Sequence, residues 1–106
     1  MNIIYICSPY AGEIERNVQN ARKFSKFAVC QGFMPLTPHL LFPQFLDDGN
    51  VDERALGMKF GIRLLDSCTE LWAFGETSSG MAMEIAYAVK KKIPVRWFNA
   101  DCEEAV

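Results

Sequence analysis

The sequence predicts an α/β fold in which helices cover both faces of a mostly parallel sheet. Short apolar runs rich in β-branched and aromatic residues alternate along the chain with longer stretches of helical spacing. Such alternation implies right-handed strand-helix-strand crossovers. The chain has 106 residues, of which 50% are hydrophobic and 23% are charged, and this suits one compact core. We therefore expect a single domain over residues 1–106.

The first part of the chain predicts two strands separated by a long helix. Residues 2–7, NIIYIC, form a nearly continuous apolar run that is typical of a strand covered on both faces. From Glu13 to Ala28, apolar residues recur every three or four positions, and Gly32 is expected to end this helix. Residues 33–36 follow as a second, short strand.

The rest of the chain continues the alternation after a break. Residues 37–46 are apolar but interrupted by prolines, which excludes a long helix, and residues 47–50, DDGN, form a turn cluster. The remaining predicted elements are a helix over 51–67, a strand over 70–74, a helix over 81–91 and a strand over 93–98. The expected architecture is a three-layer, Rossmann/flavodoxin-like domain with a sheet of four, or five, strands.

Composition excludes several classes of function. The 11 basic residues are scattered and are outnumbered by 13 acidic ones, which disfavours nucleic-acid binding. No window approaches the roughly 20 apolar residues of a membrane span, and the start lacks the features of a signal peptide. We expect a cytoplasmic protein with no nucleic-acid or membrane partner.

The four cysteines show none of the close spacings of a zinc site or a redox motif. Cys7, Cys30 and Cys68 lie in or beside apolar runs and are expected to be buried reduced thiols, whereas Cys102 is expected to be exposed. We predict no metal and no cofactor.

One acidic residue stands out because of its apolar neighbours. In parallel sheets, ligands bind beyond the carboxyl ends of the strands, so the loops over 7–12 and 74–80 should meet at one cleft. Glu84 follows the second loop in TSSGMAMEIAYA and lies among apolar residues of the predicted helix. It is either a solvated helix residue or a functional carboxylate at this cleft.

Three stretches carry a resemblance to a known family. They are YICSPYAGEIERN, PLTPHLLFPQFLDD and ELWAFGETSSGMAMEIAYA. Together they resemble the nucleoside 2-deoxyribosyltransferase-like superfamily, which includes the 2′-deoxynucleoside 5′-phosphate N-glycosidases, and most closely a small uncharacterised branch of it. The resemblance covers residues 2–98.

The resemblance implies a catalytic role for Glu84. In the characterised relatives, the glutamate of a motif small-x-Gly-x-x-x-Glu is the nucleophile, and Glu84 occupies that position after Ser78 and Gly80. Attack on the anomeric carbon would give a covalent glycosyl-enzyme, as in a retaining glycosidase. The relatives place a tyrosine of the first strand beside the nucleophile, and Tyr5 matches it. A purely structural role for Tyr5, with its ring in the core, stays open.

The resemblance also implies substrate contacts. The 5′-phosphate glycosidases have serine where this chain has Ser78, and a hydroxyl beside free helix amides suits a phosphate. Ser78 can equally be a simple helix cap. Ser79 and Gly80 belong to the same helix entry, and Ser8 and Arg16 could complete the phosphate site.

Three further residues are assigned to substrate binding. They are Pro9 and Tyr10 of the first loop and His39, the single histidine, which titrates in a range useful for acid-base chemistry. A structural role for His39 is the alternative. The aspartate that orients the base in the transferases has no counterpart in residues 58–62, and Asp66 is expected to have a structural role.

These observations predict an enzyme that cleaves the N-glycosidic bond of a nucleoside 5′-monophosphate or nucleoside, by hydrolysis or by deoxyribosyl transfer. The expected partners are a small nucleoside or nucleotide and a second copy of the chain in a homodimer. The alternative is a binding module for nucleotide derivatives that has lost turnover, and cleavage of the nicotinamide-ribose bond of NAD is a third possibility.

Overall fold

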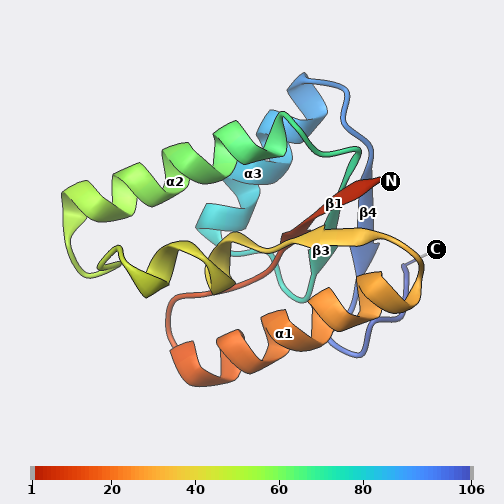
Figure 1. Cartoon of the computed structure of the whole chain (residues 1–106), viewed down its shortest axis with the longest axis horizontal. Coiled ribbons are helices and arrows are strands. Elements are labelled where there is room, and N and C mark those ends of the chain that lie inside the picture. The colour runs from red at the N-terminus through yellow and green to blue at the C-terminus, as the bar shows by residue number, and fades with distance from the viewer. Residues whose placement is uncertain (1, 106) are drawn as a thin grey trace.

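The computed structural model describes residues 2–105 and contains one parallel sheet with helices on both faces (Figure 1). The strands are β1 (Ile3–Cys7), β2 (Met34–Leu36), β3 (Glu70–Phe74) and β4 (Val95–Phe98). They lie in the order β2-β1-β3-β4, and each neighbouring pair is parallel. The α/β class and the four-stranded sheet are therefore confirmed.

Three helices complete the layers. They are α1 (Ile14–Cys30), α2 (Val51–Leu65) and α3 (Ser79–Lys90). α1 covers one face of the sheet, and α2 and α3 cover the other (Figure 1). Between β2 and α2 the chain forms two 3₁₀ turns, Pro38–Leu40 and Phe42–Gln44, each with a proline in its first positions. The prediction that no long helix forms there is confirmed.

Two predicted boundaries shift for reasons of backbone hydrogen bonding. α3 begins at Ser79 rather than at residue 81, because Ser78 already caps its first turn. β4 begins at Val95 rather than at residue 93, because Pro94 has no amide hydrogen and Ile93 donates its amide to the carbonyl of Ala88.

Side chains of the central strands alternate between two cores. Ile4 and Ile6 of β1 face α1, together with Phe24 of that helix. Tyr5 and Cys7 face the opposite layer and belong to the core under α2 and α3. Because successive strand residues point to opposite faces, Tyr5 and Cys7 lie on the same side of the sheet as Glu84.

The cysteine predictions are partly wrong. Cys7 and Cys68 are buried, as expected, but Cys30 is exposed at the end of α1. The buried positions of α1 include Phe24 and Ala28, and Cys30 lies two residues beyond Ala28, off the buried face. Cys102 is partly buried rather than exposed.

Within residues 2–105, no helix has the length and apolar character needed to cross a membrane. In the same range no group of three or more His, Cys, Asp or Glu side chains is arranged to hold a metal ion.

Candidate functional site

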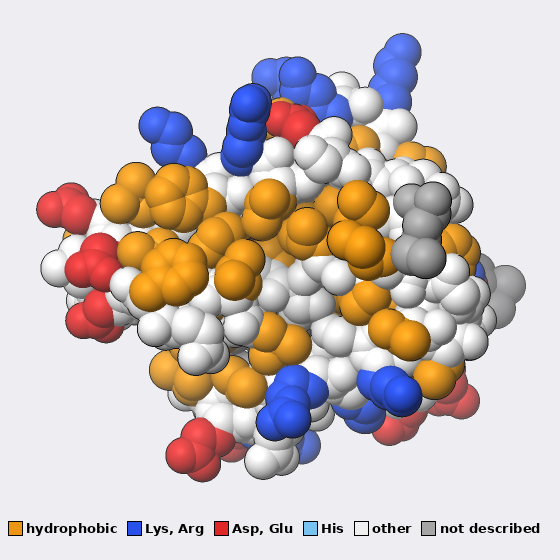
Figure 2. Space-filling model, viewed as in Figure 1, with side chains coloured by type: hydrophobic (Ala, Val, Ile, Leu, Met, Phe, Trp, Pro, Cys, Tyr) orange, Lys and Arg blue, Asp and Glu red, His pale blue; other side chains and the backbone are white. Residues whose placement is uncertain are grey.

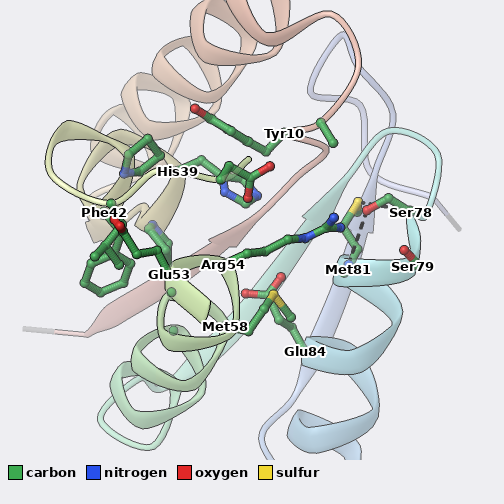
Figure 3. Close-up of a pocket in the computed structure, with 18 of the residues that line it drawn as sticks. Tyr10, His39, Phe42, Glu53, Arg54, Met58, Ser78, Ser79, Met81 and Glu84 are labelled. Atoms are coloured by element: carbon green, nitrogen blue, oxygen red, sulfur yellow. Dashed lines mark hydrogen bonds between the residues drawn. The ribbon is translucent and has the colours of Figure 1, made fainter. Parts of the chain in front are cut away.

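A pocket opens at the carboxyl ends of β1 and β3, where the strand order reverses. Its walls come from the loop after β1, the two 3₁₀ turns, the inner side of α2 and the first two turns of α3 (Figure 3). Residues 10–11 and 78–81 both line it. The prediction that the loops after these two strands meet at one cleft is confirmed, and it follows from the position of the switch point in a doubly wound sheet.

Glu84 points from α3 into this pocket and is only 6% exposed (Figure 3). Its carboxylate accepts two hydrogen bonds from β1. The hydroxyl of Tyr5 donates to Oε2, and the thiol of Cys7 donates to Oε1 over 3.7 Å. Glu84 is therefore not a solvated helix residue.

No cation forms an ion pair with this buried carboxylate among the residues that the structure describes. Burial raises the pKa of Glu84, and the hydrogen bonds from Tyr5 and then Cys7 act in the opposite direction. Burial and the nearby carboxylate also raise the pKa of both donors, so they stay protonated. The arrangement presents one carboxylate, held by two neutral donors, to whatever occupies the pocket.

Gly61 of α2 leaves the space that the hydrogen bond between Tyr5 and Glu84 needs. A Cβ atom at this position would lie 2.8 Å from the hydroxyl of Tyr5 and 3.7 Å from Oε2 of Glu84. Any side chain at residue 61 would therefore displace the tyrosine. An aspartate at residue 61 would therefore not fit beside Tyr5 and Glu84.

His39 lies at the other side of the pocket, beside the loop after β1. Its Nε2 is 2.7 Å from the carbonyl oxygen of Ser8, and its ring centroid is 5.1 Å from that of Tyr10. Burial lowers the pKa of His39, although the Ser8 carbonyl and nearby Asp48 oppose this. A neutral His39 that donates from Nε2 to Ser8 keeps Nδ1 as a hydrogen-bond acceptor.

Ser8 and Pro9 of the first loop, both predicted to bind substrate, do not line the pocket. The hydroxyl of Ser8 is buried, does not line the pocket, and has no hydrogen-bond partner in the described part of the chain. Pro9 also lies outside the lining, whereas Tyr10 belongs to it. Ser8 therefore contacts the site through its carbonyl oxygen and His39.

The amino end of α3 forms the opposite wall. The hydroxyl of Ser78 accepts a hydrogen bond from the amide of Met81 over 3.3 Å, which confirms the capping role. The amides of Ser79 and Gly80 belong to the first turn and have no acceptor within the helix. Both residues line the pocket. Free amides at the amino end of a helix favour an anion there.

The structure does not bring Arg16 to the pocket. Arg16 is exposed and pairs with Glu13 one turn earlier over 3.4 Å. Arg54 is present instead, reaching from α2 toward Ser78 and Met81 (Figure 3). Sequence reasoning missed Arg54, although a cation close to the start of a helix opposes the helix dipole and could have signalled a role in binding.

Two acidic residues that sequence reasoning missed also line the pocket, Asp48 and Glu53. Asp48 lies near Tyr10, whose pKa is raised by burial and by this carboxylate. Asp66, by contrast, accepts a hydrogen bond from the hydroxyl of Tyr87 over 2.6 Å and is absent from the pocket lining. Its position fits the structural role expected for it.

Comparison with solved structures assigns the fold. A 2-deoxyribosyltransferase from the psychrotolerant bacterium Bacillus psychrosaccharolyticus aligns with a TM-score of 0.73 and 18% identity, over 92% of this chain and 72% of that one. A 2-deoxyribosyltransferase from Leishmania mexicana aligns with a TM-score of 0.68 and 19% identity, over 93% of this chain and 65% of that one. The fold is therefore of the nucleoside 2-deoxyribosyltransferase-like class.

The family is assigned by sequence. The chain belongs to the DUF7768 family, a domain of unknown function, whose model matches residues 2–98. No curated protein matches the chain.

Proposed function

We propose that this protein cleaves the N-glycosidic bond of a nucleoside 5′-monophosphate or nucleoside, with Glu84 as the nucleophile. The observation that carries the proposal is the burial of Glu84 at the pocket without a cationic partner among the described residues. A buried, uncompensated carboxylate is costly, and such groups are concentrated at functional sites.

The proposed reaction proceeds by double displacement. A carboxylate oxygen of Glu84 forms a bond to C1′ of the sugar, while the bond from C1′ to the base nitrogen breaks and the base leaves with that electron pair. Water, or a second base, then attacks C1′ and releases Glu84 as a carboxylate. The base takes up a proton from solvent or from the acceptor. Tyr5 keeps its proton throughout and orients the carboxylate.

The walls of the pocket suit the two ends of such a substrate. Arg54 together with Ser78 and the first amides of α3 offers a site for a 5′-phosphate. Tyr10 and His39 offer a stacking surface for a base, with Asp48 close to both. Asp48 could accept hydrogen bonds from the base, which is the task that the missing aspartate of the transferases performs.

The two aligned structures support a nucleoside substrate. Both are of 2-deoxyribosyltransferases, and the one from Bacillus psychrosaccharolyticus is described as a biocatalyst for nucleoside synthesis. We extend this substrate class to the present chain because its pocket lies at the switch point of the shared fold. A cytoplasmic location, expected from the sequence, is part of the proposal.

We further propose that the protein is a homodimer. Apolar side chains gather on the face shown in Figure 2, and Phe45 and Val51 are 62% and 82% exposed. Further exposed apolar residues of the turns and α2 are Leu41, Leu56 and Phe60. A second copy that covers them would lie next to the pocket, because the ring of Phe42 in its wall is 5.6 Å from that of Phe60. Light scattering of the wild type and of Phe45→Glu tests this, and a monomeric wild type would contradict it.

The function is tested by incubating the protein with nucleoside 5′-monophosphates, nucleosides and NAD, with and without an acceptor base, and following free base by chromatography. We expect base release from a nucleotide or nucleoside, and loss of release in Glu84→Gln by a factor of about 10³ or more, as for removal of other catalytic nucleophiles. Unchanged release in Glu84→Gln would exclude this mechanism. Thermal stabilisation by a nucleotide without release from any substrate would favour the binding module.

A further inference from the structure

We propose that Cys7 is a positioning residue that holds the carboxylate of Glu84 from the side facing away from the pocket. The inference rests on the proposed function of Glu84 and adds a residue that acts only through it. Cys7 is the last residue of β1, is 1% exposed, and lies 3.7 Å from Oε1 of Glu84. Tyr5 and Glu84 line the pocket, whereas Cys7 does not.

Two donors are needed to fix a carboxylate plane. The terminal torsion of a glutamate side chain has a broad energy minimum, so a single hydrogen bond leaves the carboxylate free to turn about it. Here Tyr5 donates to Oε2 and Cys7 donates to Oε1. The two donors are two residues apart on one strand, and the period of the strand places both on the face that Glu84 covers.

A thiol is a suitable hydrogen-bond partner for a nucleophilic carboxylate. A thiol is a weak donor, so it can orient Oε1 while taking up little of its negative charge. Burial raises the pKa of Cys7, which keeps the proton on sulfur and the bond directed toward Glu84. The thiol thus adds orientation without adding a second charge to a buried site.

The other charged and titratable groups around Glu84 are accounted for. None of them makes an ion pair with it among the described residues. Besides Tyr5 and Cys7, the groups that line its pocket or belong to or pack against its core are Asp48, Glu53, Arg54, His39, Tyr10, Cys68 and Tyr87. In the described residues, only Tyr5 and Cys7 make hydrogen bonds with the side chain of Glu84.

The test compares Cys7→Ala, Cys7→Ser and the control Cys68→Ala. Cys68 is a buried thiol of the same core, but it donates to the carbonyl of Leu64 over 3.5 Å. The titration of Glu84 is followed by NMR of protein labelled with ¹³C at glutamate carboxyls, with its signal assigned by Glu84→Gln. Base release is measured against pH with the best substrate of the panel.

We expect Cys7→Ala to raise the pKa of Glu84 measured by NMR. The acidic limb of the plot of kcat against pH should move to higher pH by the same amount. The kcat of Cys7→Ala should fall on the order of fivefold with little change in KM, as for the loss of one modest hydrogen bond. Cys7→Ser keeps a donor, so its Glu84 titration and kcat should stay closer to those of the wild type. Cys68→Ala should match the wild type in both. Should Cys7→Ala not fold, Cys7→Val is the donor-free variant that refills the space.

The NMR titration separates this inference from the proposed function. If the pKa of Glu84 is the same in the wild type, in Cys7→Ser and in the donor-free variant (Cys7→Ala or Cys7→Val), the proposed role of Cys7 is overturned. This holds whatever the activities of the variants are. Absence of base release by the wild type would overturn the proposed function, while the titration would still show whether Cys7 holds the carboxylate.

Discussion

The hydroxyl of Tyr5 on β1 donates a hydrogen bond to Oε2 of Glu84 on α3, across 79 positions of sequence. The contact joins the strand and the helix that flank the pocket, and both residues are buried. It is the stronger of the two restraints on the proposed nucleophile, because a hydroxyl is a better hydrogen-bond donor than the thiol of Cys7.

Tyr5→Phe removes this donor while keeping the ring in the core. A hydrogen bond to a charged group contributes about 1.5–3 kcal/mol, so kcat should fall roughly 10- to 100-fold. The lost donor no longer opposes the effect of burial on the pKa of Glu84, so the acidic limb of the kcat profile should move to higher pH. Tyr87→Phe is the control, because it removes a hydroxyl that donates to Asp66 and not to Glu84, and it should keep the wild-type profile.

Glu84 should reduce the stability of the fold at neutral pH. Burial raises the pKa of Glu84 in the folded state above the ordinary value of 4.5, which applies to the unfolded chain. At a pH between the unfolded-state pKa and the folded-state pKa, the folded state binds more protons than the unfolded state. Stability therefore falls as pH rises through this range, and Glu84→Gln avoids the loss. We expect Glu84→Gln to melt higher at pH 7, by roughly 4–8 °C for each kcal/mol gained, and to match the wild type below pH 4.

Melting curves at several pH values check this sign. Glu76→Gln removes an exposed carboxylate from the loop after β3 and should change the melting temperature little at any pH. A Glu84→Gln variant that melts lower than the wild type at pH 7 would show that the carboxylate stabilises the fold, contrary to this expectation.

The fold was predictable from sequence because its elements have strong local signals. The run NIIYIC and the spacing of Phe24 and Ala28 report buried faces directly. The burial of Glu84 was signalled by its apolar neighbours, but its donors were not, since the contact with Cys7 depends on how a helix packs on a distant strand. Arg54 was missed and Arg16 preferred, because closeness to a loop in sequence does not show which helix faces the pocket.

Gly61→Ala should be destabilising even though alanine normally favours a helix. The added Cβ would lie 2.8 Å from the hydroxyl of Tyr5, which is already hydrogen-bonded to the carboxylate of Glu84. Overpacking of this kind costs about 1–3 kcal/mol, more than the gain of about 1 kcal/mol expected from helix propensity. Base release should fall as well, since Tyr5 is displaced from Glu84.

Gly57→Ala is the matched control, one turn earlier on the same helix. Its Cβ would meet only Leu46, at an ordinary distance of 3.7 Å. It should therefore stabilise the protein by about 0.5–1 kcal/mol in urea unfolding. Equal stability changes in the two variants would contradict the close packing of Gly61 against Tyr5.

Arg54 should distinguish nucleotides from nucleosides. It reaches toward Ser78 at the amino end of α3, where free amides already favour an anion, and a guanidinium adds charge-assisted hydrogen bonds to phosphate. Arg54→Ala should raise KM for a nucleoside 5′-monophosphate about 10- to 100-fold, corresponding to roughly 1.5–3 kcal/mol, and leave KM for the matching nucleoside unchanged. Arg16→Ala removes an exposed arginine that pairs with Glu13 on its own helix and does not line the pocket, so both KM values should stay at those of the wild type. An equal rise in KM for nucleotide and nucleoside in Arg54→Ala would show that Arg54 does not bind the phosphate. A rise in KM for the nucleotide alone in Arg16→Ala would show that the phosphate binds beside the first loop.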